Sequence, residues 1–343
     1  MQARRVLTAI AALAVCLAVV DLAAARSFFD LIARGIAWLA DPLLDTLGLP
    51  VNRQGNELRA ADGAWAVVVS EVCDGHGLVA AWAAICAALA PGSARGIAAT
   101  LIGLLAIQVF NLLRVIALVA GLSHGPDLFQ TLHLEAFPLL TAALMAALTA
   151  TVAPVGARRL AAALALGLGL AVLWYSVAEN IAGAILVPFA NAVLAAFGPD
   201  LVRGISGAEG AWSIATTLVA RAEPLAFYSL PIHPADFLVA LPALLAAAIV
   251  ARRGAVVVAL ALCAAGVALA LGTVTGLWSA MEQAGAPLQK APGGGTAAEI
   301  VPAEQPGAIV RGVARLAQNL IVHANLLVLP ALLLAARYRP DED

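Results

Sequence analysis

The chain has 343 residues, of which 63% are hydrophobic and only 12% are charged, and its formal net charge is −2. So few charged residues cannot cover a water-soluble globule of this length, so the composition excludes a soluble protein and predicts a polytopic membrane protein. The nearly neutral charge also gives no sign of nucleic-acid binding.

The N-terminal segment Met1–Arg5 precedes an apolar run that extends to about Ala25, close to the ~20 residues that a helix needs to cross a bilayer. A secretory signal would show a similar pattern, but everything downstream is also apolar, which favours a retained first span. Residues 27–47 mix charged residues with aromatic and aliphatic ones. This pattern predicts a helix that lies in the membrane interface, with a kink at Pro42.

The first polar segment runs from Leu49 to Val72, and we expect a turn at Asn52–Asn56 and a short extended piece at Ala64–Val69. It leads into the sequence Ser-Glu-Val-Cys-Asp-Gly-His-Gly at residues 70–77. Apolar runs at residues 78–89, 97–122 and 134–153 then bring the number of expected spans to four.

The second half repeats this plan with a span at residues 160–177, an interfacial piece at 182–197 and a polar segment at 198–234. Spans at residues 237–250, 255–277 and about 313–336 follow, with a flexible Gly- and Pro-rich loop at 283–307. Residues 35–69 and 183–217 share an order of features that ends in Gly-Ala-Trp, at 63–65 and at 210–212. This indicates a weak internal repeat, for which chance similarity in an Ala-rich chain is the alternative.

The basic residues mark every second connection of an eight-span path. They are Arg4, Arg5, Arg95, Arg158, Arg159, Arg252, Arg253, Arg337 and Arg339. By the positive-inside rule these connections and both termini are cytoplasmic, and the polar segments face outward. We therefore expect an all-α bundle of about eight transmembrane helices with interfacial helices, N-in and C-in, in a bacterial inner membrane.

Cys73 is the one cysteine at a polar boundary, because Cys16, Cys86 and Cys263 lie inside apolar runs where a thiol is usually inert. The glycines at 75 and 77 let backbone approach a bound peptide, and the N-terminus of a helix starting here would favour the thiolate. These features identify Cys73 as a candidate nucleophile. A cysteine that merely caps a transmembrane helix is the alternative.

Arg114 lies near the outward end of the third span, and an arginine at a helix centre in the bilayer costs at least ~2.5 kcal/mol, so it is a candidate functional residue. Asn111 is three residues earlier and shares its helix face. His133 begins the fourth span at the same outward level and is a candidate acid and base. The alternatives are an arginine that snorkels to the interface and a histidine that bonds backbone or lipid headgroups.

His76 is a competing base, although it lies between two glycines in an expected flexible turn. Together with His124, Asp127 and His133 it could suggest a metal site, but these residues lack any recognised zinc spacing, so we expect neither metal nor cofactor. His323 in the last span is expected to make helix–helix hydrogen bonds.

The residues Cys73-Asp74-Gly75, the Asn-x-x-Arg sequence ending at Arg114, and His133 resemble the motifs of the exosortase/archaeosortase family of membrane cysteine transpeptidases, in the same order. The resemblance covers about residues 4–153, and Asp74 replaces the commoner serine. It implies a catalytic membrane core at residues 1–155. Residues 156–343 are then a second four-helix module, similar to the partner proteins that accompany some short exosortases.

The family resemblance also implies roles: Cys73 attacks a peptide bond, Arg114 stabilises the oxyanion and His133 protonates the leaving amine. Asn111 and Gly75 of the matching motifs are expected to support them, as are Asp74 and His76 beside the cysteine, although Asp74 and His76 depart from the family pattern. The implied substrates are membrane-anchored proteins with a C-terminal signal made of a motif, a transmembrane helix and a basic tail. An unidentified acceptor nucleophile would release the product. A non-catalytic scaffold or a transporter with an exosortase-like core stays open, although a transporter would place its charges nearer the midplane.

The basic connections predict a topology that paired reporters can measure. A fusion after Arg159 is expected to report the cytoplasm, and an insertion within residues 293–295 is expected to report the outside, because the positive-inside rule fixes both points. The pair to use is a phosphatase active only outside and a fluorescent protein that folds only inside. The opposite result at either point would contradict the eight-span path.

Overall fold

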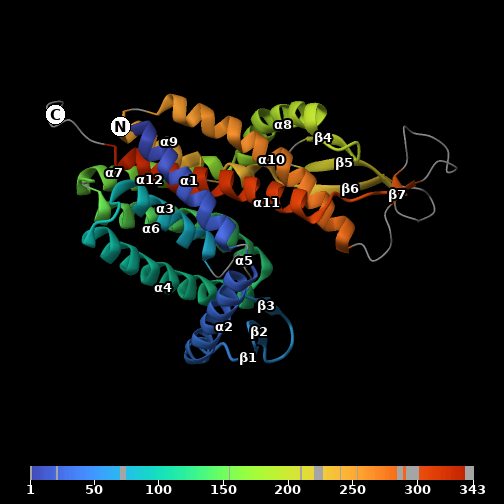
Figure 1. Cartoon of the computed structure of the whole chain (residues 1–343). Coiled ribbons are helices and arrows are strands. Elements are labelled where there is room, and N and C mark those ends of the chain that lie inside the picture. Colours follow the sequence, from blue (N-terminus) through green and yellow to red (C-terminus); the bar gives the residue numbers. More distant parts are fainter. Residues whose placement is uncertain are drawn as a thin grey trace. The chain divides into compact units, whose positions relative to one another are not determined.

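The computed structural model describes residues 2–20, 22–69, 75–153, 155–208, 211–219, 227–239, 241–252, 254–283, 289–290 and 301–336, most of them in helices (Figure 1). Within these residues six helical stretches are long and apolar enough to cross a membrane. They are Ala3–Val20, Ala94–His124, Ala157–Trp174, Ala178–Phe197, Ala255–Glu282 and Ala308–Leu334. The chain is therefore a mostly helical multi-pass membrane protein.

These six stretches differ in detail from the eight expected spans. The helices at His76–Leu89, Phe137–Val152 and Pro234–Val250 are apolar but shorter than a full crossing, whereas Ala178–Phe197, expected at the interface, is long enough to cross. The helix that contains the other expected interfacial piece is not among the six. The count of eight spans stays a prediction.

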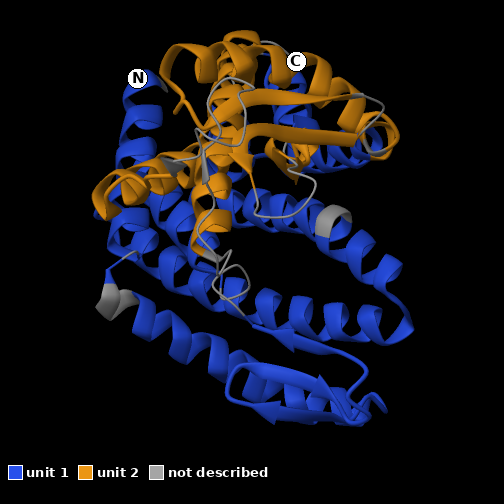
Figure 2. Cartoon of the chain, turned by 90° about the vertical axis from the view of Figure 1, so that its right-hand side faces the viewer, with its two compact units in different colours: residues 1–171, 240–254, 323–343 blue, residues 172–239, 255–322 orange. Residues whose placement is uncertain are grey.

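The chain forms two compact units, which interleave along the sequence (Figure 2). Unit 1 consists of residues 1–171, 240–254 and 323–343, and unit 2 consists of residues 172–239 and 255–322. The units therefore do not divide the chain at residue 155. Whether the second half acts as a partner module stays a prediction.

Unit 1 contains most of the helices and one small sheet. Its elements are α1 (Gln2–Val20), α2 (Ala23–Thr46), β1 (Val51–Gln54), β2 (Glu57–Ala60), β3 (Ala66–Val68), α3 (His76–Leu89), α4 (Ala94–His124), α5 (Pro126–Thr131), the π-helix η1 (Leu132–Ala136), α6 (Phe137–Val152), the greater part of α7 (Ala157–Tyr175), α9 (Leu241–Val250), the π-helix η4 (Ala324–Val328) and α12 (Leu329–Leu334).

The first polar segment folds into the antiparallel sheet β1-β2-β3, which corrects the all-α expectation. The expected turn is confirmed around Gly55, whose φ of 64° is a left-handed conformation that glycine adopts freely. The expected extended piece is β3. Leu58 of β2 and Val69 are fully buried in a cluster with residues of α2 and α4, so the sheet is anchored to both helices.

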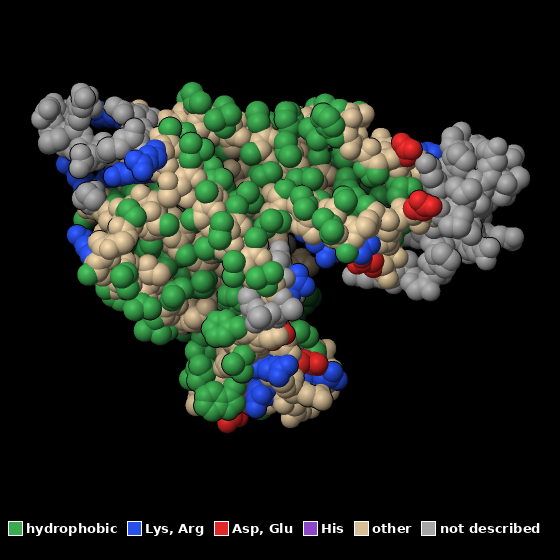
Figure 3. Space-filling model, viewed as in Figure 1, with side chains coloured by type: hydrophobic (Ala, Val, Ile, Leu, Met, Phe, Trp, Pro, Cys, Tyr) green, Lys and Arg blue, Asp and Glu red, His purple; other side chains and the backbone are tan. Residues whose placement is uncertain are grey.

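Helix α2 buries one face and exposes the other. Its buried side includes Ala33, Ala37 and Ala40, spaced at about one helical turn, while Leu31 and Trp38 are more than half exposed. Charged side chains gather over the neighbouring strands in the surface view (Figure 3). This division between apolar and charged surface is the one expected of an element at a membrane boundary.

Unit 2 combines long helices with a larger sheet. Its elements are the end of α7, α8 (Ala178–Phe197), β4 (Val202–Ala208), β5 (Ala211–Val219), β6 (Phe227–Ile232), the 3-10 helix η2 (Pro234–Phe237), α10 (Ala255–Gln283), β7 (Gln289–Lys290), β8 (Val301–Pro302) and all of α11 (Ala308–His323) except its last residue.

The second polar segment is the second correction to the all-α expectation, because β4, β5 and β6 form an antiparallel sheet in which β5 is central. Ile214 of β5 pairs with Ile205 on one side and with Leu230 on the other. Two further short strands, β7 and β8, extend this sheet from within the loop that was expected to be flexible.

The order of elements is repeated along the chain. With the short elements α5, η1, η2, β7, β8 and η4 left aside, the series α1, α2, three strands, α3, α4 and α6 is followed by α7, α8, three strands, α9, α10 and then α11 with α12. In the first series α2 packs on the long helix α4, and in the second series α8 packs on the long helix α10. Each Gly-Ala-Trp tryptophan packs back towards its second helix: Trp65 on the α2 cluster, and Trp212 against Gly183 of α8. The fold thus shares the repeat that the sequence indicated.

Candidate functional site

The entrance to α3 lies against α4 in unit 1. Gly75 precedes the first residue of α3 with φ of 80°, a conformation that side chains other than glycine rarely adopt. A Cβ atom at this position would overlap the side-chain amide of Asn111. The glycine of the Cys-x-Gly sequence and the asparagine of the Asn-x-x-Arg sequence are therefore in direct contact, as the absence of a side chain at Gly75 permits.

The Asn111 side chain is fully buried on the face of α4 that also buries Ile107 and Val115. Neither its Nδ2 nor its Oδ1 atom has a hydrogen-bond partner among the described residues. A buried amide left in this condition costs ~1–3 kcal/mol, so native proteins seldom keep one without a use. Its donor and acceptor are available to a group beyond the described part of the chain.

One turn further along α4, Arg114 contacts His133. The Arg114 Nη2 atom lies 3.4 Å from His133 Nδ1, a long hydrogen bond in which the guanidinium can only donate. Nδ1 is therefore the acceptor, which assigns the ring proton of the neutral imidazole to Nε2. The ring of Phe137 lies under the guanidinium at 5.9 Å, a distance suited to a cation–π contact.

His133 is held within a π-helical turn. The structure places it in η1, inside a helical run that begins at Pro126 and continues into α6, so it does not start the helix as expected. Single π-helical turns often occur at functional sites because the wider turn redirects side chains. The ring of Phe129 stacks on His133 with centroids 5.5 Å apart.

Burial and charge both act on His133, which lies outside the candidate membrane spans. Burial lowers the pKa of His133 from its ordinary 6.5, and the positive charge of Arg114 lowers it further. The imidazole is therefore neutral at pH 7 and able to accept a proton.

His76 is better ordered than the sequence indicated. It is the first residue of α3 rather than part of a flexible turn, and its ring makes an edge contact with Phe29 of α2 at 5.8 Å. His323 also comes close to this helix start, because its ring lies where a Cβ of Gly77 would be. The sequence placed His323 at a helix–helix contact but gave no sign that the contact adjoins His76.

The other histidine and aspartate of the conceivable metal cluster lie in separate surroundings. His124 Nδ1 lies 2.8 Å from the Ala120 carbonyl oxygen of its own helix, and Asp127 is exposed in α5. Among the described residues no group of three or more His, Cys, Asp or Glu side chains is arranged to hold a metal ion.

The structure thus brings together Gly75, Asn111, Arg114 and His133, with His76 at the start of the adjoining helix. Cys73 and Asp74 lie outside the described residues. Sequence reasoning missed the aromatic residues Phe129 and Phe137. Their spacing of four residues on either side of His133 was the available signal, since such residues share one helix face.

The contact between Gly75 and Asn111 predicts a non-additive pair of substitutions. Gly75→Ala is expected to destabilise the protein by ~1–3 kcal/mol, because it combines a positive φ with overlap of a buried amide. In an Asn111→Ala background the same change should cost less, since the overlap is gone while the backbone strain remains. Thermal unfolding of the detergent-solubilised protein measures both.

Gly35→Ala is the matched control, because no atom lies within 4 Å of a Cβ placed there. It should leave the unfolding temperature unchanged or raise it slightly, as alanine favours the helix. Strictly additive costs for the Gly75 and Asn111 changes would contradict the contact.

Comparison of the chain with protein-family models finds no match, and comparisons with curated proteins and with solved structures find no significant match.

Proposed function

We propose that the protein is a membrane-embedded cysteine transpeptidase or protease of the exosortase type, which cleaves C-terminal sorting signals from exported, membrane-anchored proteins. The observation that carries the proposal is the 3.4 Å contact between Arg114 and His133, made by two elements that the sequence separates. An intramembrane guanidinium beside a neutral imidazole supplies a stabiliser for an oxyanion and a carrier for a proton.

We assign Cys73 as the nucleophile because it lies only two residues before Gly75, which contacts Asn111. Two residues of extended chain span at most ~7 Å, which bounds the distance between the Cα atoms of Cys73 and Gly75. Gly75 contacts Asn111, and Asn111 lies one turn from Arg114. The chain therefore keeps the candidate nucleophile close to Gly75, the residue that contacts the Asn-x-x-Arg face of α4.

The reaction begins with transfer of the Cys73 thiol proton to His133. The thiolate attacks the carbonyl carbon of the scissile peptide bond, and the carbonyl oxygen becomes an oxyanion to which Arg114 donates hydrogen bonds. Arg114 must leave His133 Nδ1 to do so, which frees that nitrogen to carry the proton. The neutral form of His133, favoured by its burial, makes it the base for this step.

The tetrahedral intermediate then collapses. The carbon–nitrogen bond breaks, the protonated His133 gives its proton to the leaving amine, and the acyl group remains on Cys73 as a thioester. An acceptor amine or water next gives a proton to His133 and attacks the thioester. The departing thiolate recovers that proton, which returns the site to its starting state.

Asn111 is assigned a positioning role in this scheme. Its buried amide, with both donor and acceptor unused among the described residues, is placed to hydrogen bond the backbone around Gly75. Such a bond would hold the nucleophile at a fixed distance from Arg114. On the topology given by the basic connections, the site faces the periplasmic side of the inner membrane.

Loss of the nucleophile gives the first test of the function. Cys73→Ala is expected to abolish processing of a co-expressed protein that ends in a sorting motif, an apolar helix and a basic tail. Arg114→Lys should lower the rate by ~10²-fold or more, because an ammonium group cannot reproduce the planar fork of donors. Cleavage is followed as a mobility shift of the tagged substrate.

Cys86→Ala and Cys263→Ala are the matched controls and should stay close to the normal rate, as both thiols lie in apolar helices. Normal processing by Cys73→Ala would exclude the cysteine mechanism and favour a non-catalytic scaffold.

His133 and His76 are the two candidate bases, and comparing them gives a separate test. His133→Ala is expected to stop turnover, because this residue holds the Arg114 contact and carries the proton in every step. His76→Ala should reduce the rate only partly, since its ring packs against Phe29 and has no assigned proton transfer. Both variants are compared in one processing assay at equal membrane expression.

Near-normal activity of His133→Ala together with loss of activity in His76→Ala would reverse the assignment. The base would then be the histidine three residues after Cys73.

A further inference from the structure

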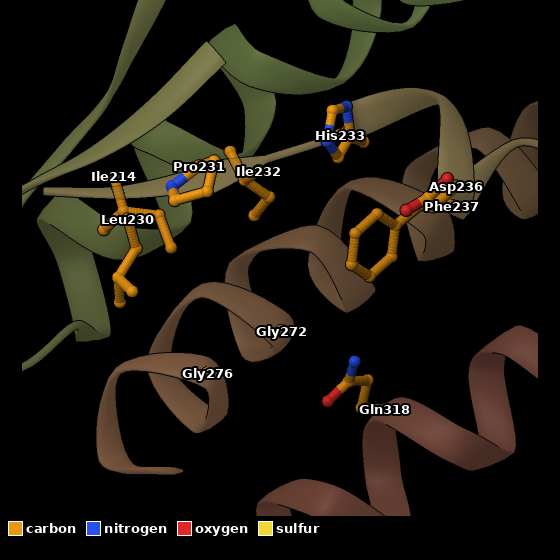
Figure 4. Close-up of a pocket in the computed structure, with 10 residues that line it drawn as sticks. All are labelled: Ile214, Leu230, Pro231, Ile232, His233, Asp236, Phe237, Gly272, Gly276 and Gln318. Atoms are coloured by element: carbon orange, nitrogen blue, oxygen red, sulfur yellow. The ribbon is translucent and has the colours of Figure 1, made fainter. Parts of the chain in front are cut away.

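Unit 2 contains a pocket of about 270 Å³ that the proposed reaction does not use (Figure 4). Its apolar walls come from Ile214 of β5, Leu230 and Ile232 of β6, and Phe237 of η2. This volume suits one side chain or a small organic molecule and is too small for a lipid or a folded partner.

One wall of the pocket is bare helix backbone. Gly272 and Gly276 lie one turn apart on α10, and a Cβ at Gly276 would meet no atom within 4 Å. A Cβ at Gly272 would instead press on Phe237 and Gln318. The pocket therefore owes its open volume to the lack of side chains on this face of α10.

The polar side chains that line the pocket are those of Gln318, His233 and Asp236. Thr275 donates a hydrogen bond of 2.9 Å to Oε1 of Gln318, which fixes the amide and leaves its Nε2 on the side of the pocket, as Figure 4 shows. At the other end stand His233 and Asp236. Glu179 Oε1 lies 3.4 Å from Nδ1 of His233 and holds that ring in place.

The charge at this end is negative. Asp236 and Glu179 supply two carboxylates against one imidazole, and one Glu179 oxygen is buried without a hydrogen-bond partner among the described residues. The same part of the chain gives the Asp236 carboxylate no ion pair with Lys or Arg. A positively charged group on a ligand is therefore electrostatically complementary to this end of the pocket.

The residues of α10 at this pocket hold positions in the second series that are equivalent to those of the candidate catalytic residues of α4 in the first. Asn111 and Gly272 each come 17 residues after the first residue of their long helix, Ala94 or Ala255. By the same count Thr275 corresponds to Arg114. Glycine and threonine thus replace the asparagine and arginine.

The contacts of these corresponding residues also match. Thr275 bonds Gln318 of the next helix as Arg114 bonds His133, and Gly272 adjoins Phe237 just after the three strands as Asn111 adjoins Gly75. At Gly272 the side chains of Phe237 and Gln318 lie against the helix backbone, and the open space of the second copy is one turn further along, at Gly276.

We propose that this pocket binds an organic cation, a guanidinium or primary ammonium group on a short apolar stem, with the cation at Asp236 and the stem beside Phe237, over the open face of α10 at Gly276. Gln318 Nε2 donates to a carbonyl oxygen of the ligand, so a basic residue of an extended peptide satisfies all of these groups. This site is separate from the proposed reaction and does not depend on Cys73.

Calorimetry on the full-length protein in nanodiscs tests the proposal, with acetyl-Ala-Arg-Ala-amide as the probe. Saturable binding is expected, and the neutral citrulline counterpart should bind at least about fivefold more weakly, the factor that ~1 kcal/mol of exposed ion pairing gives. Agmatine distinguishes the source of the cation: tighter binding of the tripeptide assigns the site to peptides, and equal or tighter binding of agmatine assigns it to free amines. Either result supports the cation site.

Three variants locate the binding. Asp236→Asn should weaken the tripeptide at least about fivefold, and Gly276→Leu should abolish binding by filling open space without disturbing a neighbour. Glu304→Gln removes an exposed carboxylate of the same unit outside the pocket and should leave affinity within about twofold. Cys73→Ala should bind normally.

The proposal is overturned if the wild type shows no saturable binding, if the citrulline peptide binds equally well, or if Asp236→Asn and Gly276→Leu both keep normal affinity. A failure of Cys73→Ala to lose processing would leave this binding result untouched, so the two proposals fail separately.

Discussion

An amide and a guanidinium on one apolar helix impose the main constraint on unit 1. Asn111 and Arg114 lie on α4, a helix apolar enough to cross a membrane, where an unpaired polar group costs several kcal/mol. The surrounding elements meet this cost at the guanidinium, through His133 and Phe137, whereas the bare backbone of Gly75 only leaves room for the amide. Among the described residues, the Nδ2 and Oδ1 atoms of Asn111 and the Nε atom of Arg114 have no hydrogen-bond partner.

Each of the two sheets packs its polar segment against helices of the same unit. Leu58 and Val69 anchor the first sheet in the same cluster as Val115 and Val119 of α4, so the strand that precedes the Cys-x-Gly sequence is tied to the helix that bears Arg114. Leu218 and Leu277 do the same for the second sheet and α10. In each unit the strands thereby fix where the chain enters the next short helix.

The membrane class, the long helices and the convergence of Asn111, Arg114 and His133 could be predicted from sequence, because they follow from hydropathy, from the cost of an intramembrane arginine and from antiparallel spans. The sheets could not. Ile214, Thr216 and Leu218 are buried and alternate along β5, but the Ala and Thr residues between them make that alternation weak. The π-helical turn at His133 was also invisible, since it depends on one extra residue in a helix that is otherwise regular.

Repetition of one element order with different side chains gives the two proposed sites different shapes and charges. The position on the long helix that carries Arg114 in the first copy carries Thr275 in the second, and the helical contact is kept as Thr275 to Gln318. The helix contact is thereby kept, while glycine in place of asparagine lets Phe237 and Gln318 lie against the backbone of α10 at Gly272. A built-in cation suits an oxyanion that exists only during a reaction. A cavity with a carboxylate at its mouth suits a ligand that brings its own positive charge, which is why we propose recognition for the second copy and catalysis for the first.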